Sequence, residues 1–208
     1  MPELISPAAD GSISDADAAK VGAAAKSCRI AAFPTETAYA LGSTGLVKAA
    51  TRRLLQIKER STLKPLPVLV ASVADAKRWV EWTPLAERLA AKLWPGPVYL
   101  LLKPTAEGRL LTFPEYPNLA VRVPAHPVAR AIVAASGVPW VCTSANKSGR
   151  PPLTDASAVA SELGAEIDAI VGGTAGVGEP TFVDAAGENA RATKIGVVSA
   201  EAVAEAAR

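Results

Sequence analysis

Short apolar runs alternate with helix-forming segments along this chain, and this alternation restricts its fold more than any other feature. Runs typical of buried strands lie at residues 30–33, 66–70, 98–102, 119–123, 140–143, 169–171 and 195–198. Segments typical of helices lie at residues 14–26, 48–58 and 127–136 and begin after residues 72, 83, 154 and 199. Alternating strands and helices predict an α/β fold with a twisted, largely parallel or mixed sheet and flanking helices.

The composition fits one domain with a single core. The chain has 208 residues, of which 50% are hydrophobic and only 5% are aromatic. That apolar content suffices to close one α/β core of mainly small aliphatic side chains, and it favours this class over a β sandwich. No internal repeat is evident, so residues 1–208 are predicted to form one domain.

Composition also argues against several classes of function. The formal net charge of +2 does not indicate a nucleic-acid binder, although charge can still gather in one cleft. Cys28 and Cys142 lie far apart and His126 is the single histidine, so no metal ligands and no disulfide framework are expected. No apolar run of about 18 residues and no basic, apolar leader occurs, which predicts a cytoplasmic protein without membrane association.

Polar clusters follow two of the expected strands where those strands end. The PTET motif at residues 34–37 follows one strand, and the TSAN motif at residues 143–146 ends another. In an open α/β sheet, ligands bind beyond the strand ends. Hydroxyl and amide side chains there suit a phosphate or a polar head group, but ordinary turns use the same residue types. Both interpretations stay open for each cluster.

Arg122 interrupts the apolar run at residues 119–123. A guanidinium beside a buried strand needs an anionic partner, which is either a protein carboxylate or a substrate. His126 lies between two prolines just before a helix, where a capping or surface role is the commoner outcome.

Lys58, Arg60 and Lys64 bring three cations into one segment between a helix and a strand. Cations at a helix C-terminus suit the helix dipole, so a solvated helix end explains this cluster as well as a binding site does. The GGTAGVG segment at residues 172–178 lacks the Lys-Ser or Lys-Thr ending of a phosphate loop and is predicted to be a flexible connection.

Five segments occur in the order PTETAYALG, KERSTLKPL, WPGPVYLLL, NLAVRVPAHP and VCTSANKSGRPPLT. Together they resemble the YrdC-like threonylcarbamoyl-AMP synthase family. They cover residues 30–155, and each is less degenerate than a single glycine fingerprint, whereas residues 172–208 match more loosely. The resemblance implies a YrdC-like domain, with a twisted mixed sheet and flanking helices around a concave basic cavity.

The resemblance also implies a reaction. Family members couple L-threonine, bicarbonate and ATP with release of pyrophosphate, and downstream tRNA threonylcarbamoyl transferase proteins use the product to modify tRNA. Negative charge accumulates in such a site, which fits fixed cations and hydrogen-bond donors better than an acid–base pair. Mg²⁺ carried mainly by ATP oxygens and water would account for the lack of a carboxylate cluster.

The residue roles implied by the resemblance fall into three groups. The catalytic residues are Lys58, Arg60, Ser144 and Asn146. The ATP contacts are Arg60, Lys64, Asn118, Asn146, Thr154 and Lys194. The threonine contacts are Thr37, Arg122 and Ser144.

The chain departs from the family pattern at four of its positions. Pro180 replaces a serine that would help to close over threonine, with Thr181 as a candidate substitute, and Lys194 replaces an arginine. Lysine presents a point charge rather than a planar fork, so the two are not equivalent for phosphate binding. Ala40 stands where a glycine is usual, and Leu69 where some relatives have histidine.

Two further functions compete with the synthase. One is a non-catalytic module that binds tRNA or other double-stranded RNA in the same basic cavity, and such binding would weaken steeply as salt concentration rises. The other is a related carbamoyl transferase module, which belongs to much longer chains with additional zinc-binding-like domains.

Overall fold

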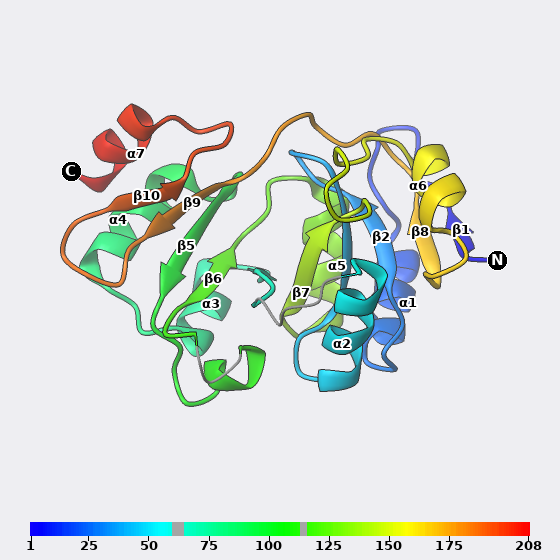
Figure 1. The fold of residues 1–208 in the computed structure, drawn as a ribbon, viewed down its shortest axis with the longest axis horizontal. Helices are drawn as coiled ribbons and strands as arrows, with labels where there is room; N and C mark the ends of the chain where they lie inside the picture. The colour runs from blue at the N-terminus through cyan, green and yellow to red at the C-terminus, as the bar shows by residue number, and fades with distance from the viewer. Residues whose placement is uncertain (60–64, 113–115) are drawn as a thin grey trace.

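The computed structural model describes residues 1–59, 65–112 and 116–208, and within them the strands form one ten-stranded sheet (Figure 1). The strand order is β1-β8-β2-β3-β7-β4-β6-β5-β9-β10. The strands are β1 (Glu3–Ile5), β2 (Ala31–Pro34), β3 (Tyr39–Thr44), β4 (Val68–Leu69), β5 (Val98–Leu102), β6 (Leu119–Arg122), β7 (Trp140–Ser144), β8 (Ala169–Val171), β9 (Thr181–Asp184) and β10 (Arg191–Lys194). The predicted α/β class is confirmed.

The sheet is mixed, and parallel pairing does not dominate it. Among the described residues, five strand pairs are antiparallel and four are parallel. The expectation of largely parallel pairing is corrected most clearly at β2 and β3, which pair antiparallel across the short turn at residues 35–38. A connection this short cannot cross back over the sheet, so its two strands must run in opposite directions.

Helices flank the sheet, and an apolar cluster lies between helices and strands on each of its two faces. They are α1 (Asp15–Ala25), α2 (Lys48–Ile57), α3 (Val73–Trp79), α4 (Pro84–Leu93), α5 (Pro127–Ser136), α6 (Ala156–Leu163) and α7 (Ala200–Ala207), with a 3₁₀ turn at Gly108–Leu111. One cluster joins α1 and α5 to Phe33 and Trp140, and the other joins α2 and α4 to the opposite side of the strands. Helices α1 and α5 pack closely because Gly22 lies against the backbone of Ser136, where a Cβ would come within 2.9 Å.

Helix starts follow the capping residues expected from the sequence. The hydroxyl of Ser14 accepts a hydrogen bond from the N–H of Asp17, and His126 caps α5 through the N–H of Val128. The same capping arrangement begins four other helices, at Ser72, Thr83, Asp155 and Ser199. These side chains satisfy N–H groups that have no partner inside the helix, which is why the helices begin there.

The C-terminal part of the chain differs from expectation. Residues 195–198, expected to form a strand, are irregular, and β10 instead lies just before them at Arg191–Lys194. The fully buried Thr181 hydroxyl donates to the carbonyl of Val198 and accepts from the N–H groups of Gly196 and Val198. The Thr181 hydroxyl therefore serves as the hydrogen-bond partner of backbone groups in residues 196 and 198 that strand pairing would otherwise satisfy.

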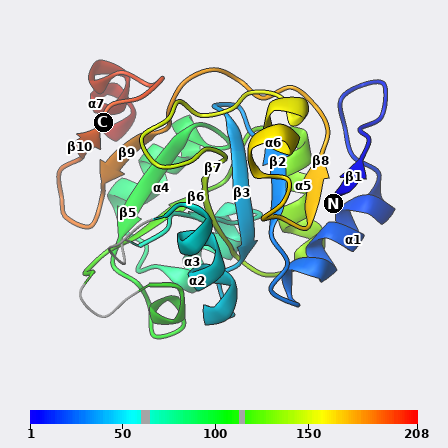
Figure 2. The ribbon, with the colours of Figure 1, turned by 45° about the vertical axis from the view of Figure 1, so that its right-hand side comes forward.

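The connection from β8 to β9 arches across the top of the molecule in both views (Figures 1 and 2). It contains the glycine-rich residues 172–178 and passes over the turn between β2 and β3, where the N–H of Gly176 donates to the carbonyl of Thr35. Within the described residues, no helix combines the length and apolar character needed to cross a bilayer.

Candidate functional site

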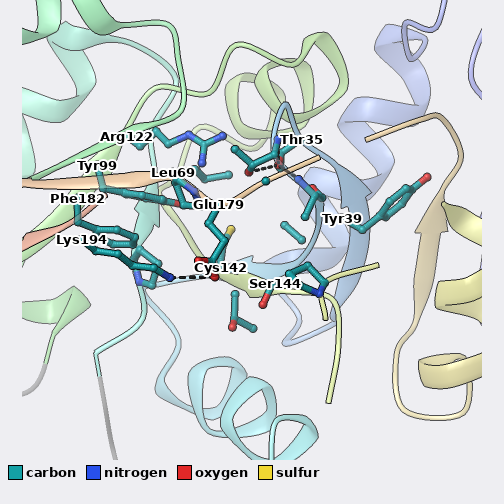
Figure 3. A pocket seen from close by; sticks show the side chains of 18 of the residues that line it. Thr35, Tyr39, Leu69, Tyr99, Arg122, Cys142, Ser144, Glu179, Phe182 and Lys194 are labelled. Carbon is teal, nitrogen blue, oxygen red and sulfur yellow. Dashed lines mark hydrogen bonds and ion pairs between the residues drawn. The ribbon is translucent and has the colours of Figure 1, made fainter. Parts of the chain in front are cut away.

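A cavity of about 280 Å³ opens on the side of the sheet that carries α1 and α5 (Figure 3). Its walls come from the turn at residues 35–38, from strands β3 to β7, from residues 178–180 and from β9 and β10. Segments that are distant in the sequence therefore meet at one cavity. Thr37, Arg122, Ser144 and Lys194, four of the residues implicated by the sequence, all line it.

Strand register explains why these side chains share one side of the sheet. Successive side chains of a strand point to opposite faces, and directly paired residues point to the same face. Leu69 pairs with Arg122, and Ala40 pairs with Ser144. Cys142, two residues before Ser144, lies on the same face of β7 and also lines the cavity. A shift of one residue in any of these strands would remove its side chain from the site.

Arg122 is enclosed beside a protein carboxylate. Its side chain is 2% exposed, and Nη2 lies 2.8 Å from Oε1 of Glu36. The Glu36 carboxylate also accepts hydrogen bonds from the N–H groups of Ala125, at 2.9 Å, and His126, at 3.2 Å. Burial alone would raise the pKa of Glu36, but the Arg122 charge and these N–H groups outweigh it and hold the pKa below its ordinary value. Glu36 is thus an anion that fixes the position of Arg122.

The guanidinium of Arg122 keeps hydrogen-bonding capacity in spite of this ion pair. Neither Nε nor Nη2 has an acceptor in hydrogen-bonding geometry among the described residues, so the 2.8 Å contact with Glu36 is electrostatic rather than an aligned hydrogen bond. The guanidinium carbon lies 5.2 Å from the centre of the Tyr99 ring, which stacks on Phe182 with centroids 4.8 Å apart (Figure 3). A buried N–H that lacks an acceptor favours an anionic ligand.

The turn at residues 35–38 presents hydroxyl groups to the cavity. Thr35 Oγ1 donates to the carbonyl of Ala38 at 2.7 Å and lies 3.1 Å from Thr37 Oγ1. The turn interpretation of this motif is therefore correct for Thr35, whose hydroxyl stabilises the turn itself. Thr35 and Thr37 both line the cavity, so Thr35 stabilises the turn and also forms part of the wall.

Lys58, Ser144 and Asn146 form a compact network beside the cavity. Lys58 is 1% exposed, and its Nζ donates to the carbonyl of Ser144 at 2.8 Å, to Oδ1 of Asn146 at 2.6 Å and to the carbonyl of Asn146. Ser144 Oγ donates to the same Oδ1 at 2.6 Å. The solvated helix end considered for Lys58 is excluded, because this ammonium group is buried and holds the TSAN loop.

Lys194 and Glu179 lie across the cavity from Ser144 (Figure 3). Lys194 Nζ is 2.9 Å from Glu179 Oε1, and the two side chains are 48% and 54% exposed. Both cations among the described lining residues, Arg122 and Lys194, are thus matched by a carboxylate. A strongly basic lining stays a prediction, because Arg60 and Lys64 fall outside the described residues.

Two of the expected ATP contacts, Asn118 and Thr154, lie outside the cavity lining. Asn118 precedes β6 and Thr154 precedes α6, and neither lines the cavity among the described residues. Ala40, Leu69 and Pro180, three of the departures from the family pattern, do line it. Thr181 does not substitute for the missing serine hydroxyl, because its own hydroxyl is bonded to Gly196 and Val198.

Several lining or supporting residues were not anticipated as site residues. Glu36 had a signal, since it is the carboxylate of the PTET motif and Arg122 needed an anionic partner. Glu179, Tyr99 and Phe182 had none, because only the pairing of β5 with β9 brings them to the cavity. Burial raises the pKa of the Cys142 thiol, so this lining group stays protonated at neutral pH.

Comparison with known proteins identifies relatives of this chain. The Sua5/YciO/YrdC family model, described as "Telomere recombination", matches residues 24–194. A threonylcarbamoyl-AMP synthase of Xanthomonas euvesicatoria pv. vesicatoria (strain 85-10) is 38% identical over 158 residues, which cover 74% of this chain and 84% of that protein.

Two solved structures share the fold. Sua5 of P. abyssi, complexed with L-threonine, has a TM-score of 0.88 and 28% identity over 99% of this chain. The present chain spans 60% of that protein's length. YciO of E. coli has a TM-score of 0.84 at 23% identity, with 95% of this chain and 96% of YciO covered. With a family match over most of the sequence and a relative at 38% identity, the chain belongs to the Sua5/YciO/YrdC family.

Proposed function

We propose that this protein is a threonylcarbamoyl-AMP synthase, which forms threonylcarbamoyl-AMP and pyrophosphate from L-threonine, bicarbonate and ATP. The observation that carries the proposal is the buried Arg122 guanidinium, whose Nε lacks an acceptor among the described residues at a cavity also lined by Thr37 and Ser144. The names of the curated relatives and the threonine complex of Sua5 support the same activity.

Threonine binds in this proposal with its carboxylate at Arg122. A guanidinium beside an apolar wall recognises a carboxylate through charge-assisted hydrogen bonds. Thr37 and Ser144 offer hydroxyl groups for the polar atoms of threonine, and Leu69 and Cys142 offer an apolar surface for its methyl group. The cavity of about 280 Å³ suits a small amino acid better than a nucleic-acid duplex.

ATP spans the cavity from Lys194 to the TSAN loop. Lys194 contacts the phosphates, which requires its pair with Glu179 to open. Asn146, Asn118 and Thr154 supply polar contacts, and Arg60 and Lys64 complete the phosphate contacts. Mg²⁺ would be held mainly by the triphosphate oxygens of ATP and by water, and it would neutralise the charge of the phosphates.

The chemistry follows from these positions. The threonine amine and bicarbonate form a carbamate with loss of water, and a carbamate oxygen attacks the α-phosphorus of ATP while pyrophosphate leaves. Charge builds up on oxygen atoms throughout, so the catalytic requirement is preorganised donors and cations. Ser144 and Asn146, fixed by Lys58, provide such preorganisation. The product passes in the cytoplasm to a tRNA threonylcarbamoyl transferase.

The test is pyrophosphate release by the purified protein. With ATP and bicarbonate present, threonine should accelerate release at least about tenfold over alanine or no amino acid. Equal rates with all three would contradict the synthase. Affinity for double-stranded RNA that falls steeply with salt, without any threonine-dependent turnover, would instead identify the RNA-binding alternative.

A further inference from the structure

The two residues after the TSAN motif, Lys147 and Ser148, hold the C-terminal end of α2. Lys147 Nζ lies 3.3 Å from Oε1 of Glu59 and 3.4 Å from the carbonyl of Ile57. Ser148 Oγ donates a hydrogen bond to the carbonyl of Lys58. Three consecutive residues at the end of α2 are thus each contacted by one dipeptide of the loop that follows β7.

The dipeptide is itself held from α6 and the residues after it. Lys147 Nζ lies 2.5 Å from Oε1 of Glu166, and the N–H of Lys147 donates to Oε1 of Glu162 at 3.2 Å. The Lys147 side chain is only 22% exposed. Several simultaneous contacts restrict a lysine far more than one exposed ion pair does. The Lys147 side chain can therefore fix the end of α2 relative to the loop that follows β7.

The contacts between α2 and the TSAN loop run in both directions. Lys58 Nζ reaches into the loop at Ser144 and Asn146, while Ser148 and Lys147 reach back to the helix end. Glu59 has φ of 50°, a left-handed conformation that is uncommon for a residue other than glycine. A left-handed residue of this kind persists when surrounding contacts enforce it. Glu59 is also the residue whose carboxylate contacts Lys147.

We propose that Lys147 and Ser148 form a clamp that sets the position of Lys58, Ser144 and Asn146 relative to one another, and that they act as positioning residues for turnover. The proposal rests on the proposed function. Of the three proposed threonine contacts, only Ser144 belongs to the clamp, whereas Thr37 and Arg122 lie on the β2–β3 turn and β6, outside it. Loss of the clamp should therefore lower kcat and leave the threonine KM largely unchanged.

The experiment compares Lys147→Met, Lys147→Arg and Ser148→Ala with a matched control. Lys147→Met keeps the length of the side chain and removes its charge, whereas Lys147→Arg keeps the charge. The control is Lys20→Met, because Lys20 also pairs with a glutamate, Glu3, but lies on α1. Each variant is measured for pyrophosphate release, thermal unfolding and amide hydrogen exchange of peptides that contain residues 54–59 and 144–148.

We expect Lys147→Met to lower kcat by about tenfold, because displacement of a reacting group by about 1 Å can cost up to about a hundredfold. The threonine KM should stay within about twofold. Amide exchange of both peptides should accelerate in Lys147→Met and Ser148→Ala. Lys147→Arg should retain kcat within about threefold, and Lys20→Met should match the wild type.

Two results would overturn the clamp. One is unchanged exchange and unchanged kcat in Lys147→Met and Ser148→Ala. The other is an equal loss of kcat and of thermal stability in Lys147→Met and Lys147→Arg, which would indicate a general packing role. If the wild type shows no threonine-dependent turnover, the proposed function fails, and amide exchange alone still decides whether the clamp exists.

Discussion

Nη2 of Arg122 lies 2.8 Å from Oε1 of Glu36, and this contact ties β6 to the turn between β2 and β3. Glu36 is held in turn by the N–H groups of Ala125 and His126, just before α5. The carboxylate thus connects three segments at one wall of the cavity. The arginine is fixed without being fully hydrogen-bonded, which leaves it able to bind a second anion.

Glu36→Gln should destabilise the protein and make its stability less dependent on pH. The folded-state pKa of Glu36 lies below the ordinary 4.5, so its contribution is complete above that value and disappears as pH falls through the folded pKa. At neutral pH, the variant leaves Arg122 without a buried counter-charge, and we expect a loss of about 3 kcal/mol in the free energy of unfolding.

Urea unfolding at several pH values measures this effect. The difference between wild type and Glu36→Gln should shrink as the pH is lowered below 4.5. Glu188→Gln is the control, because Glu188 is exposed between β9 and β10. A difference that is constant over the whole pH range would show that Glu36 does not ionise in the folded state as described.

Arg122→Lys should weaken threonine binding by about tenfold or more. A lysine keeps the charge but loses the planar fork and the contact with the Tyr99 ring, 5.2 Å away. Calorimetric titration with threonine gives the affinity directly. Arg78→Lys serves as the control, since Arg78 also lies over an aromatic ring, that of Trp79, but on the exposed surface. Equal threonine affinity in all three proteins would argue against the proposed carboxylate site.

Lys58→Met should lower both activity and stability. It removes an ammonium group that donates to the Ser144 carbonyl and to the side chain and carbonyl of Asn146, and each such charge-assisted hydrogen bond contributes about 1.5–3 kcal/mol. We expect turnover to fall at least about tenfold because Ser144 and Asn146 lose their support. Unfolding curves and pyrophosphate release measure the two effects.

Lys92→Met is the control for Lys58→Met. Lys92 also donates to a backbone carbonyl, that of Glu205, at 3.0 Å, but it does so at the surface. Its replacement should change stability by less than about 1 kcal/mol. A Lys58→Met variant with wild-type stability would mean that the network seen at the TSAN loop is not maintained in solution.

Glu179→Gln should lower the KM for ATP by about twofold to fivefold. Lys194 pairs with Glu179 at 2.9 Å, and release of this half-exposed pair, worth less than about 1 kcal/mol, frees the lysine for phosphate. The decrease should vanish in a Lys194→Ala background and at high salt. Glu188→Gln, an exposed change between β9 and β10, is the control. A decrease that persists in the Lys194→Ala background would contradict this explanation.

Much of the fold could be predicted because apolar runs and capping residues act locally. The bounds predicted for β5, α5 and β8 agree with the structure. Strands β1, β3, β9 and β10 were not predicted. Strand β3 carries Gly42, Ser43 and Thr44 in a buried position, and β10 is a largely exposed edge strand, so neither has an apolar run.

The candidate site was less accessible to prediction than the fold. The need of Arg122 for an anion followed from its neighbours, but the identity of Glu36 depends on how the β2–β3 turn meets the start of α5. The buried role of Lys58 depends on the approach of α2 to the end of β7. Such contacts arise from packing between elements, and the periodicity of apolar residues within one element does not reveal them.

Gly176 passes so close to the PTET turn that a Cβ there would come within 2.0 Å of the Glu36 carbonyl oxygen. The chain then needs only a few residues to reach Glu179 and Pro180 at the cavity. To admit a bulkier amino acid, the connection between β8 and β9 could therefore be redesigned alone. Such a design would reshape the wall formed by residues 178–180 while every group assigned to the chemistry kept its sequence.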